Sequence, residues 1–369
     1  MAEALKQQFG ALVVTSIASM IQGVYPRFDA TGFSRDVLDA FEPLALMARA
    51  ERITSALQRY LPADYAAAID ILLASIGDRL NRTDRFGMAP FLYLPYVLFV
   101  ARYGTADFET SMRAQYELTH RFTAEFSIRT FLRRYPAETL ARLRDWALDP
   151  SPHVRRLVSE GTRPRLPWAE RLVDFQRDPT PVLELLELLR DDPEDYVRRS
   201  VANNLNDIAK DHPARVLAVA EQWLVDATPS RRRLVQHGLR SLVKAGDARA
   251  LRLLGFAATP AQIAGIRISP KRPHIGDALT IELSIHNPSR RPTSVNLDLR
   301  VHYQKAHGRS KPKVFKLKRL SLTPDETAAT RKTISLADMS TRKHHPGRHR
   351  VEALINGRAV PLGEFWLYA

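Results

Sequence analysis

A carboxylate at the end of a predicted helix breaks a local rule of helix chemistry. Glu160 stands just before Gly161, a residue type that often ends helices. The negative end of the helix dipole disfavours an acid there by a few tenths to about 1 kcal/mol. Such exceptions are expected at functional sites, where a carboxylate can position water or stabilise positive charge. The harmless alternative is an exposed Glu160 that pairs with Arg163 or Arg156.

A second acid, Asp207, lies on a predicted helix that is polar on one side. Apolar residues form a single stripe of this helix, so we expect Asp207 on an opposite, polar ridge that also carries Asn203 and Lys210. A solvated polar face is common on helices. The pattern alone therefore does not separate a catalytic acid from a surface one.

A third acid, Glu125, is ambiguous for a similar reason. Arg121 and Arg129 flank it at i−4 and i+4. Ion pairs at this spacing on a helix surface are worth about 0.3–0.5 kcal/mol each. Surface pairing explains Glu125 without any chemistry.

A stiff, basic loop follows Glu160. Residues 162–168 contain two prolines, which fix φ, together with Arg163, Arg165 and Trp168. Guanidinium groups bind phosphates with two hydrogen bonds, and an indole stacks on a base or a sugar face. The composition indicates contact with nucleic acid, and the alternative is that Trp168 is an ordinary packing residue before the next helix.

Repeated helices are predicted to position these side chains. Asp149–Val158 matches Asp192–Val201 at a constant offset of 43 residues, within the period of helical solenoids, and a weaker third copy begins at Pro229. Apolar residues recur at helical spacing as far as about Phe256, between short breaks that contain Pro or Asp. We therefore predict an all-α solenoid over residues 1–258.

The pattern changes after this solenoid. Alternating apolar and polar residues, as in the segments 279–285, 295–303 and 351–355, predict half-buried strands. About seven short strands without a cysteine indicate an immunoglobulin-like β-sandwich that lacks a disulfide, which we place at residues 265–369. The chain is thus predicted to be a multidomain protein, all-α and then all-β.

Charge is concentrated in the predicted sandwich. The net charge is +15, and residues 265–369 hold 20 Lys and Arg against 8 Asp and Glu. A basic surface of this kind favours a polyanion such as DNA. A solvated surface that only aids solubility is the alternative.

Composition and motifs also exclude several functions. The chain has no cysteine, so thiolate nucleophiles, iron–sulfur clusters and Cys-ligated zinc are excluded, and a reducing cytosol fits. Neither an HExxH motif nor a glycine-rich phosphate loop is present, so we expect no metal and no nucleotide cofactor. The longest apolar runs are too short to cross a bilayer, which predicts a cytoplasmic protein with no membrane partner.

Two segments resemble a known family. Ser159–Ala169 (SEGTRPRLPWA) and Arg198–Pro213 (RRSVANNLNDIAKDHP) are similar to motifs of the AlkC family of bacterial DNA alkylation-repair glycosylases, relatives of AlkD built from HEAT-like repeats. The sandwich resembles that of the AlkC subgroup with an immunoglobulin-like domain. The resemblance implies a base-excision-repair enzyme that hydrolyses the N-glycosidic bond of small cationic bases, chiefly 3-methyladenine, in kinked duplex DNA without full base flipping.

The resemblance also implies roles for individual residues. The catalytic acids would be Glu125, Glu160 and Asp207, with water activation by Asp207 or Glu160 and with Trp168 against the lesion. The remaining substrate-binding candidates share the basic loop and the Asp207 helix; they are Arg163, Arg165, Asn203 and Lys210. Arg163, Arg165 and basic residues of the sandwich would hold phosphates.

Two other functions stay open on the sequence alone. A non-catalytic helical-repeat scaffold could bind DNA or a protein through its concave face. Cleavage of the abasic product through a Schiff base would need a lysine of depressed pKa, and Lys210 is the nearest candidate. The expected partner is double-stranded DNA that contains alkylated bases or the abasic product, bound by a monomer.

Overall fold

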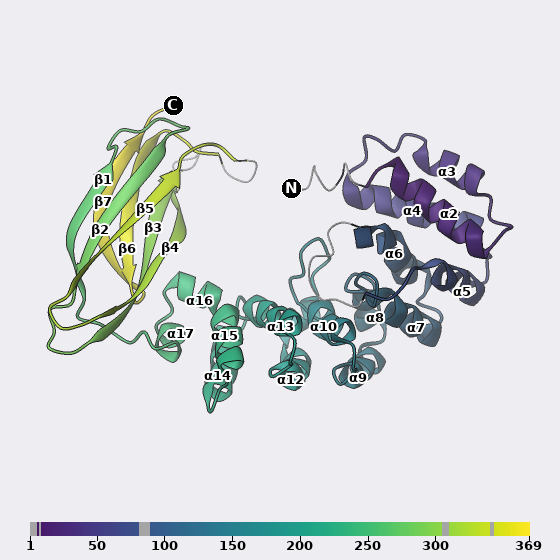
Figure 1. Ribbon diagram of the computed structural model, residues 1–369, viewed down its shortest axis with the longest axis horizontal. Coiled ribbons are helices and arrows are strands. Elements are labelled where there is room, and N and C mark those ends of the chain that lie inside the picture. Colours follow the sequence, from purple (N-terminus) through teal and green to yellow (C-terminus); the bar gives the residue numbers. More distant parts are fainter. Residues whose placement is uncertain (1–5, 7–8, 81–88, 305–309, 340–342) are drawn as a thin grey trace. The chain divides into compact units, whose positions relative to one another are not determined.

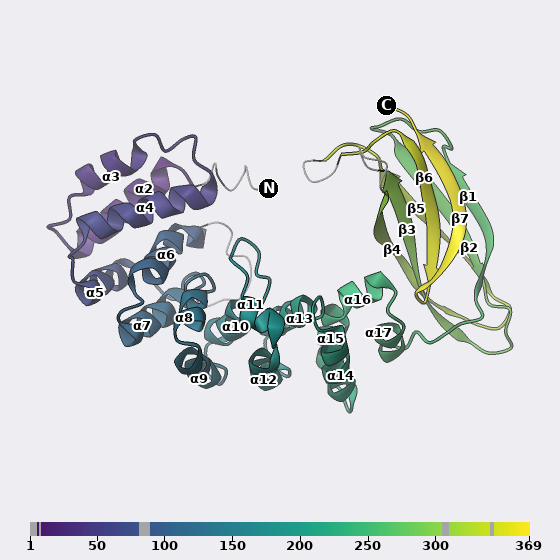
Figure 2. The same cartoon turned by 180° about the vertical axis from the view of Figure 1, so that it is seen from behind.

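A computed structural model describes residue 6 and residues 9–80, 89–304, 310–339 and 343–369 (Figures 1 and 2). The chain divides into two compact units. The first comprises Met1–His212 and Ala227–Gly238, and the second comprises Pro213–Asp226 and Leu239–Ala369. None of the described helices is long and apolar enough to cross a membrane.

The first unit is helical throughout its described part. Its elements are α2 (Ala11–Val24), α3 (Ala30–Leu38), α4 (Leu46–Tyr60), α5 (Tyr65–Ser75), the 3₁₀ helix η1 (Ala89–Tyr93), α6 (Leu94–Tyr103), α7 (Phe108–Thr119), α8 (Ile128–Arg134), α9 (Pro136–Trp146), α10 (Pro152–Gly161), α11 (Val173–Arg177), α12 (Thr180–Leu189), α13 (Asp195–Ile208) and α15 (Pro229–Gly238). Aspartates cap several of these helices. The carboxylates of Asp29, Asp64 and Asp107 each accept a hydrogen bond from the backbone N–H three residues later, which stabilises the first turn.

Helices α10, α13 and α15 pack against one another in a row, and α9 and α12 lie behind α10 and α13 (Figures 1 and 2). Each copy of the repeat places apolar side chains between these two layers. Val154, Leu157 and Val158 of α10 are fully buried, as are Val197 and Val201 of α13. The apolar spacing seen in the sequence is therefore the core of the repeat.

The two copies of the repeat also begin with the same turn. The carboxylate of Asp149 accepts a 2.7 Å hydrogen bond from the N–H of Ser151, and that of Asp192 accepts a 2.9 Å bond from the N–H of Glu194. These aspartates are the residues that the 43-residue offset equates. The offset therefore relates structurally equivalent turns.

One arginine in each copy holds this turn. It donates to the backbone carbonyl five residues earlier, and the pairs are Arg155 with Pro150, Arg198 with Pro193 and, in the third copy, Arg232 with Ala227. The same bond thus recurs in all three copies. These three arginines serve the fold.

The second unit contains α14 (Pro213–Leu224), α16 (Arg240–Ala245) and α17 (Ala248–Leu253), followed by a β-sandwich. Its strands are β1 (Gln262–Ser269), β2 (Ala278–His286), β3 (Thr293–Gln304), β4 (Ser310–Leu322), β5 (Thr327–Ser335), β6 (Gly347–Ile355) and β7 (Arg358–Leu367). They form a three-stranded sheet in the order β1-β2-β5 and a four-stranded sheet in the order β4-β3-β6-β7, and every paired strand is antiparallel.

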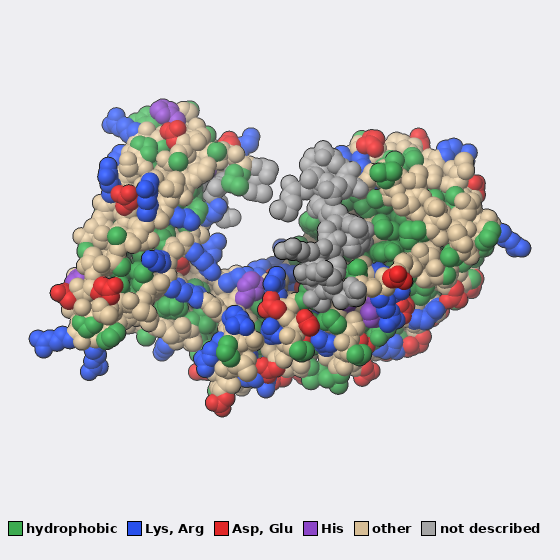
Figure 3. Space-filling model, in the orientation of Figure 1, with side chains coloured by type: hydrophobic (Ala, Val, Ile, Leu, Met, Phe, Trp, Pro, Cys, Tyr) green, Lys and Arg blue, Asp and Glu red, His purple; other side chains and the backbone are tan. Residues whose placement is uncertain are grey.

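The predicted alternation along the strands is confirmed. Leu279, Ile281, Leu283 and Ile285 of β2 are buried in the core between the sheets, together with alternate residues of β3 and β6. Lys and Arg side chains are spread over the outer surface of the sandwich (Figure 3). An apolar core with a basic exterior is what the sequence predicts for this part of the chain.

Candidate active site

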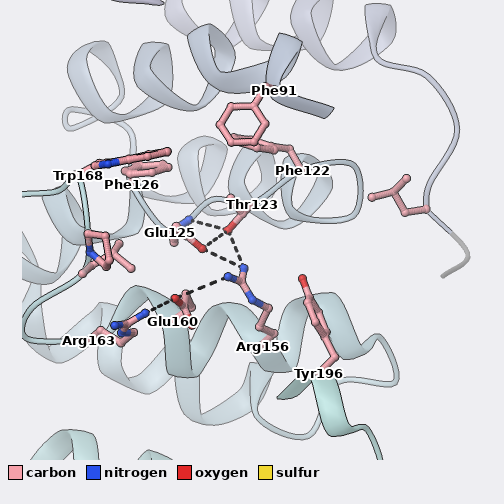
Figure 4. A pocket seen from close by; sticks show the side chains of 13 residues that line it. Phe91, Phe122, Thr123, Glu125, Phe126, Arg156, Glu160, Arg163, Trp168 and Tyr196 are labelled. Atoms are coloured by element: carbon pink, nitrogen blue, oxygen red, sulfur yellow. Dashed lines mark hydrogen bonds and ion pairs between the residues drawn. The ribbon is translucent and has the colours of Figure 1, made fainter. Parts of the chain in front are cut away.

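A pocket of about 390 Å³ in the first unit collects half of the predicted site residues (Figure 4). Its walls are largely apolar, and its polar groups are carboxylates, guanidiniums and hydroxyls. The lining residues are Leu80, Phe91, Phe122, Thr123, Glu125, Phe126, Arg156, Glu160, Arg163, Leu166, Pro167, Trp168 and Tyr196. An apolar cavity with a few convergent charged groups is the usual form of a binding site for a small organic group.

Close packing of two helices brings Glu160 to this pocket. Glu160 lies in the last turn of α10, and Gly161 ends that helix against α8. A Cβ atom at Gly161 would stand only 2.5 Å from Cγ2 of Ile128, the first residue of α8. Glycine thus permits the close approach that sets Glu160 beside the connection between α7 and α8.

Glu160 is buried and fully hydrogen-bonded. One carboxylate oxygen accepts a 2.6 Å bond from Nη1 of Arg163 and lies 3.7 Å from Nη2 of Arg156; the other accepts a 2.6 Å bond from the hydroxyl of Ser200. Burial raises the pKa of Glu160, but Arg156, Arg163 and Ser200 outweigh it and hold that pKa below its ordinary value. Both predicted arginine partners are present. The alternative of an exposed ion pair is wrong, since the residue is only 6% exposed.

Asp207 is buried as well, and the prediction of a solvated ridge is wrong at this residue. Helix α13 packs against α10, and Arg163, just beyond the end of α10, reaches over to Asp207, which is 2% exposed. Its carboxylate accepts a 2.8 Å bond from Nε of Arg163 and a 2.9 Å bond from Nζ of Lys210. Arg163 therefore bridges Glu160 and Asp207.

The expected helical neighbours of Glu125 are not its partners. Glu125 lies in the connection between α7 and α8, and there i−4 and i+4 residues do not share a face. Arg121 instead pairs with Glu117, and Arg129 donates to backbone carbonyls. The predicted surface ion pairs are wrong because the segment is not a helix.

Arg156 holds Glu125 at the pocket. Oε2 of Glu125 accepts a 2.9 Å bond from Nη1 of Arg156 and a 2.8 Å bond from the hydroxyl of Thr123 (Figure 4). Within the described part of the chain, Oε1 of Glu125 accepts no hydrogen bond. Burial alone would lower the pKa of Arg156, but Glu125, Tyr196 and Glu160 raise it, so the guanidinium stays charged between two carboxylates.

Trp168 lies in a turn that a buried arginine clamps. Its φ is +62°, its side chain is 59% exposed and it lines the pocket. Arg129, from α8, donates 3.1 and 2.7 Å hydrogen bonds to the carbonyls of Gly161 and Arg163 and a further bond to the carbonyl of Glu170. Burial, chiefly, lowers the pKa of Arg129 to about 10. The predicted stiffness of the loop thus has a source outside the loop as well as its prolines.

Three predicted binding residues do not line the pocket. Arg165 forms a two-bond ion pair with Asp211 at 3.0 and 2.6 Å. Lys210 bonds the carboxylate of Asp207, and Oδ1 of Asn203 lies 3.1 Å from Nε2 of His237. Arg163 lines the pocket, but it is buried between two acids rather than displayed on the loop surface.

Sequence reasoning missed several residues of the pocket. The guanidinium of Arg156 lies 5.2 Å above the ring of Tyr196, and burial raises the pKa of that tyrosine, so its hydroxyl stays protonated. Tyr196 replaces His153 at the equivalent position of the repeat, which is the one signal that could have found it. The rings of Phe91, Phe122 and Phe126 give no such signal because they converge only through tertiary packing.

Comparison with known proteins defines the class of protein to which this fold and site belong. Residues 119–234, which contain the three acids, match the DNA alkylation repair enzyme family, and residues 262–369 match the C-terminal Ig-like domain of the uncharacterised protein YhaZ. The chain is 36% identical to YhaZ of Bacillus subtilis (strain 168) over 98% of both sequences. It is 38% identical, with a TM-score of 0.93 and 99% coverage of both chains, to the alkylpurine DNA glycosylase AlkC of Pseudomonas fluorescens, solved bound to DNA containing an abasic site analog.

Repeated helices around a buried acid–arginine network, with an Ig-like sandwich after them, thus mark a DNA alkylation-repair protein. The chain belongs to the AlkC family of DNA alkylation-repair glycosylases, in the subgroup with a C-terminal immunoglobulin-like domain.

Proposed function

We propose that the protein is a monofunctional DNA glycosylase of base excision repair. It hydrolyses the N-glycosidic bond of small cationic alkylated bases, chiefly 3-methyladenine, in kinked duplex DNA without full base flipping. The observation that carries this proposal is the pocket in which Glu125 and Glu160 stand among aromatic rings, with Asp207 tied to it by Arg163. Membership of a glycosylase family supports it.

The chemistry needs little proton transfer, because an alkylated cationic base is already a good leaving group. The sugar develops positive charge as the bond breaks, and fixed carboxylates stabilise such charge best when they need not reorganise. Arg156 and Arg163 keep Glu160 ionised and immobile. The acid–arginine network is, in this proposal, the preorganised electrostatic part of the enzyme.

Glu125 is the acid that we assign to the attacking water. Both oxygens of Glu160 and both oxygens of Asp207 already accept hydrogen bonds from side chains. Oε1 of Glu125 accepts none from the described residues, so it can accept one from a water molecule in the pocket. This assignment departs from the choice of Asp207 or Glu160 that we made from the sequence.

The remaining residues bind and position the DNA. We propose that Trp168, half exposed at the mouth of the pocket, contacts the lesion, and that Arg165, Asn203 and Lys210 act on the substrate from outside the pocket lining. Residues 1–258 would be the catalytic and DNA-binding domain and residues 265–369 a DNA-contacting sandwich. The protein would act as a monomer on alkylated or abasic duplex DNA in the bacterial cytoplasm, without a cofactor.

A non-catalytic scaffold is the competing function, and one pair of variants separates the two. Glu125→Gln should reduce release of free base from methylated duplex by about 10²–10⁴-fold, the usual effect of losing a general base, while binding to an abasic duplex is kept. Glu109→Gln is the matched control, because Glu109 forms an exposed ion pair with Arg142. Equal release by both variants would contradict the role of Glu125, and no release by the unaltered protein would favour the scaffold.

Schiff-base cleavage of the abasic product is not part of this proposal. Nζ of Lys210 donates a 2.9 Å hydrogen bond to the carboxylate of Asp207, and Lys210 is not among the residues that line the pocket, so the pocket does not present this amine to the sugar. Borohydride reduction of the enzyme with an abasic duplex should therefore leave no covalent complex.

A further inference from the structure

Each copy of the repeat carries arginines at two adjacent equivalent positions, and the two positions differ in their contacts. The first arginine of each pair bonds the backbone carbonyl five residues earlier. The second is Arg156 in the first copy, Arg199 in the second and Arg233 in the third. Arg156 lines the candidate active site, whereas Arg199 and Arg233 line a different hollow.

This hollow, of about 210 Å³, lies between α13 and α15 of the first unit. On the face shown in Figure 3, basic side chains gather where these helices lie. The lining residues are Asp195, Arg198, Arg199, Ala202, Ser230, Arg233, Leu234 and His237. Three guanidiniums thus share a small space with one carboxylate.

The repeat explains why the hollow carries excess positive charge, whereas the arginines of the active site are paired with acids. The residue equivalent to Glu160, 43 positions further on, is Asn203, so one of the two acids beside Arg156 has no counterpart here. Arg199 pairs with Asp195 at 2.9 Å, but the arginine side chain is 70% exposed. Arg233 bonds the hydroxyl of Ser230 at 3.0 Å and has no carboxylate partner among the described residues.

We propose that this hollow binds a backbone phosphodiester of the DNA whose lesion enters the active-site pocket, an inference that rests on the proposed function. Guanidinium groups are the preferred donors to phosphate oxygens, and the hollow holds three of them against a single carboxylate, Asp195. Arg199 and Arg233 are the ligands, and His237 lies beside them.

The distance between the two pockets suggests which phosphate is bound. Neighbouring helices pack about 8–10 Å apart, and one strand of DNA advances about 3.4 Å per nucleotide. The hollow lies one helix beyond the active site along the row α10, α13, α15. The contacted phosphate should therefore stand on the order of three nucleotides from the lesion.

Salt dependence of binding tests the contact. The affinity for a duplex with an abasic analogue is measured for the full chain, for Arg199→Gln and for Arg233→Gln, across about 50–200 mM salt. Loss of one phosphate contact makes the slope of log affinity against log salt concentration shallower by about 0.9. Between the lowest and highest salt, the affinity of either variant should therefore fall by a factor about threefold smaller than that of the unaltered protein. Arg232→Gln, which removes an exposed charge from the same helix but not from the hollow, should keep the full slope.

A neutral phosphate then locates the contact. Single methylphosphonate linkages are placed one to five or so nucleotides from the abasic site, and each should weaken binding of the unaltered protein where it removes a contacted charge. At one position, the linkage should not weaken binding of Arg199→Gln any further. Such non-additive losses identify two groups that interact. Additive losses at every position, or slopes equal to that of Arg232→Gln, would overturn the proposal. Absence of base release would refute the glycosylase alone, because the salt slopes report DNA contact whether or not chemistry occurs.

Discussion

Replacement of Arg163 tests whether the buried acid–arginine network is the structural centre of the site. Arg163→Gln removes the group that bridges Glu160 at 2.6 Å and Asp207 at 2.8 Å. Loss of one partner of a buried ion pair costs about 3–5 kcal/mol, because the other charge stays buried. Glu160 keeps Arg156 and Ser200, and Asp207 keeps Lys210, so we expect the lower end, about 3 kcal/mol.

The pH dependence of this loss has a definite sign. The folded state holds the pKa of Glu160 below its ordinary value of 4.5. The stability that this shift contributes is present above that ordinary value and is lost as the pH falls through the folded value. The gap between the variant and the unaltered protein should therefore be widest at neutral pH and should narrow in acid.

Urea unfolding followed by far-ultraviolet circular dichroism, near pH 7 and near pH 4, measures both effects. Arg177→Gln is the control, since Arg177 forms an exposed pair with Asp174 at 3.6 Å and such pairs contribute about 0–1 kcal/mol. A loss in the free energy of unfolding for Arg163→Gln no larger than that for Arg177→Gln would contradict a structural role for the buried network. So would a gap between Arg163→Gln and the unaltered protein that widens on acidification.

Three further variants probe the frame of the pocket. Arg129→Met should loosen the Trp168 turn, so amide hydrogen exchange of Leu172, whose N–H bonds the carbonyl at position 164, should accelerate. Gly161→Ala should cost about 1–3 kcal/mol in urea unfolding, because its Cβ would stand 2.5 Å from Ile128; an unchanged midpoint would contradict the packing. Trp168→Ala should alter stability by less than about 1 kcal/mol, since the indole is mostly exposed, yet slow base release, and a large stability loss would identify it as a packing residue.

The fold could be predicted where one face of an element is buried. Alternation along β2 and the second half of β3, and the helical spacing of the apolar residues in α10 and α13, are direct consequences of packing one face against a core. The grouping of α14 with the sandwich and of α15 with the first unit was not foreseen. It depends on which helices pack together, and local periodicity does not carry that information.

The site could be predicted only in part, because tertiary packing decides which polar residues are buried. Glu160 was found through an electrostatic exception, and the structure adds what offsets it: hydrogen bonds from Arg163 and Ser200 and the nearby charge of Arg156. Asp207 was expected in solvent because the pattern of its own helix carries no information about Arg163, which reaches it from the loop after α10. Arg156 and Tyr196 belong to the repeat, so their types looked structural until the pocket placed them beside Glu125.

Release of free base by the unaltered protein tests the central claim most directly. The purified full chain is incubated with methylated duplex DNA, with a chelator and without any nucleotide, and free bases are identified by mass spectrometry. We expect release of 3-methyladenine by the unaltered protein and its near-complete loss in Glu125→Gln. Tight binding to the same DNA with no free base would contradict it and would leave a DNA-binding scaffold.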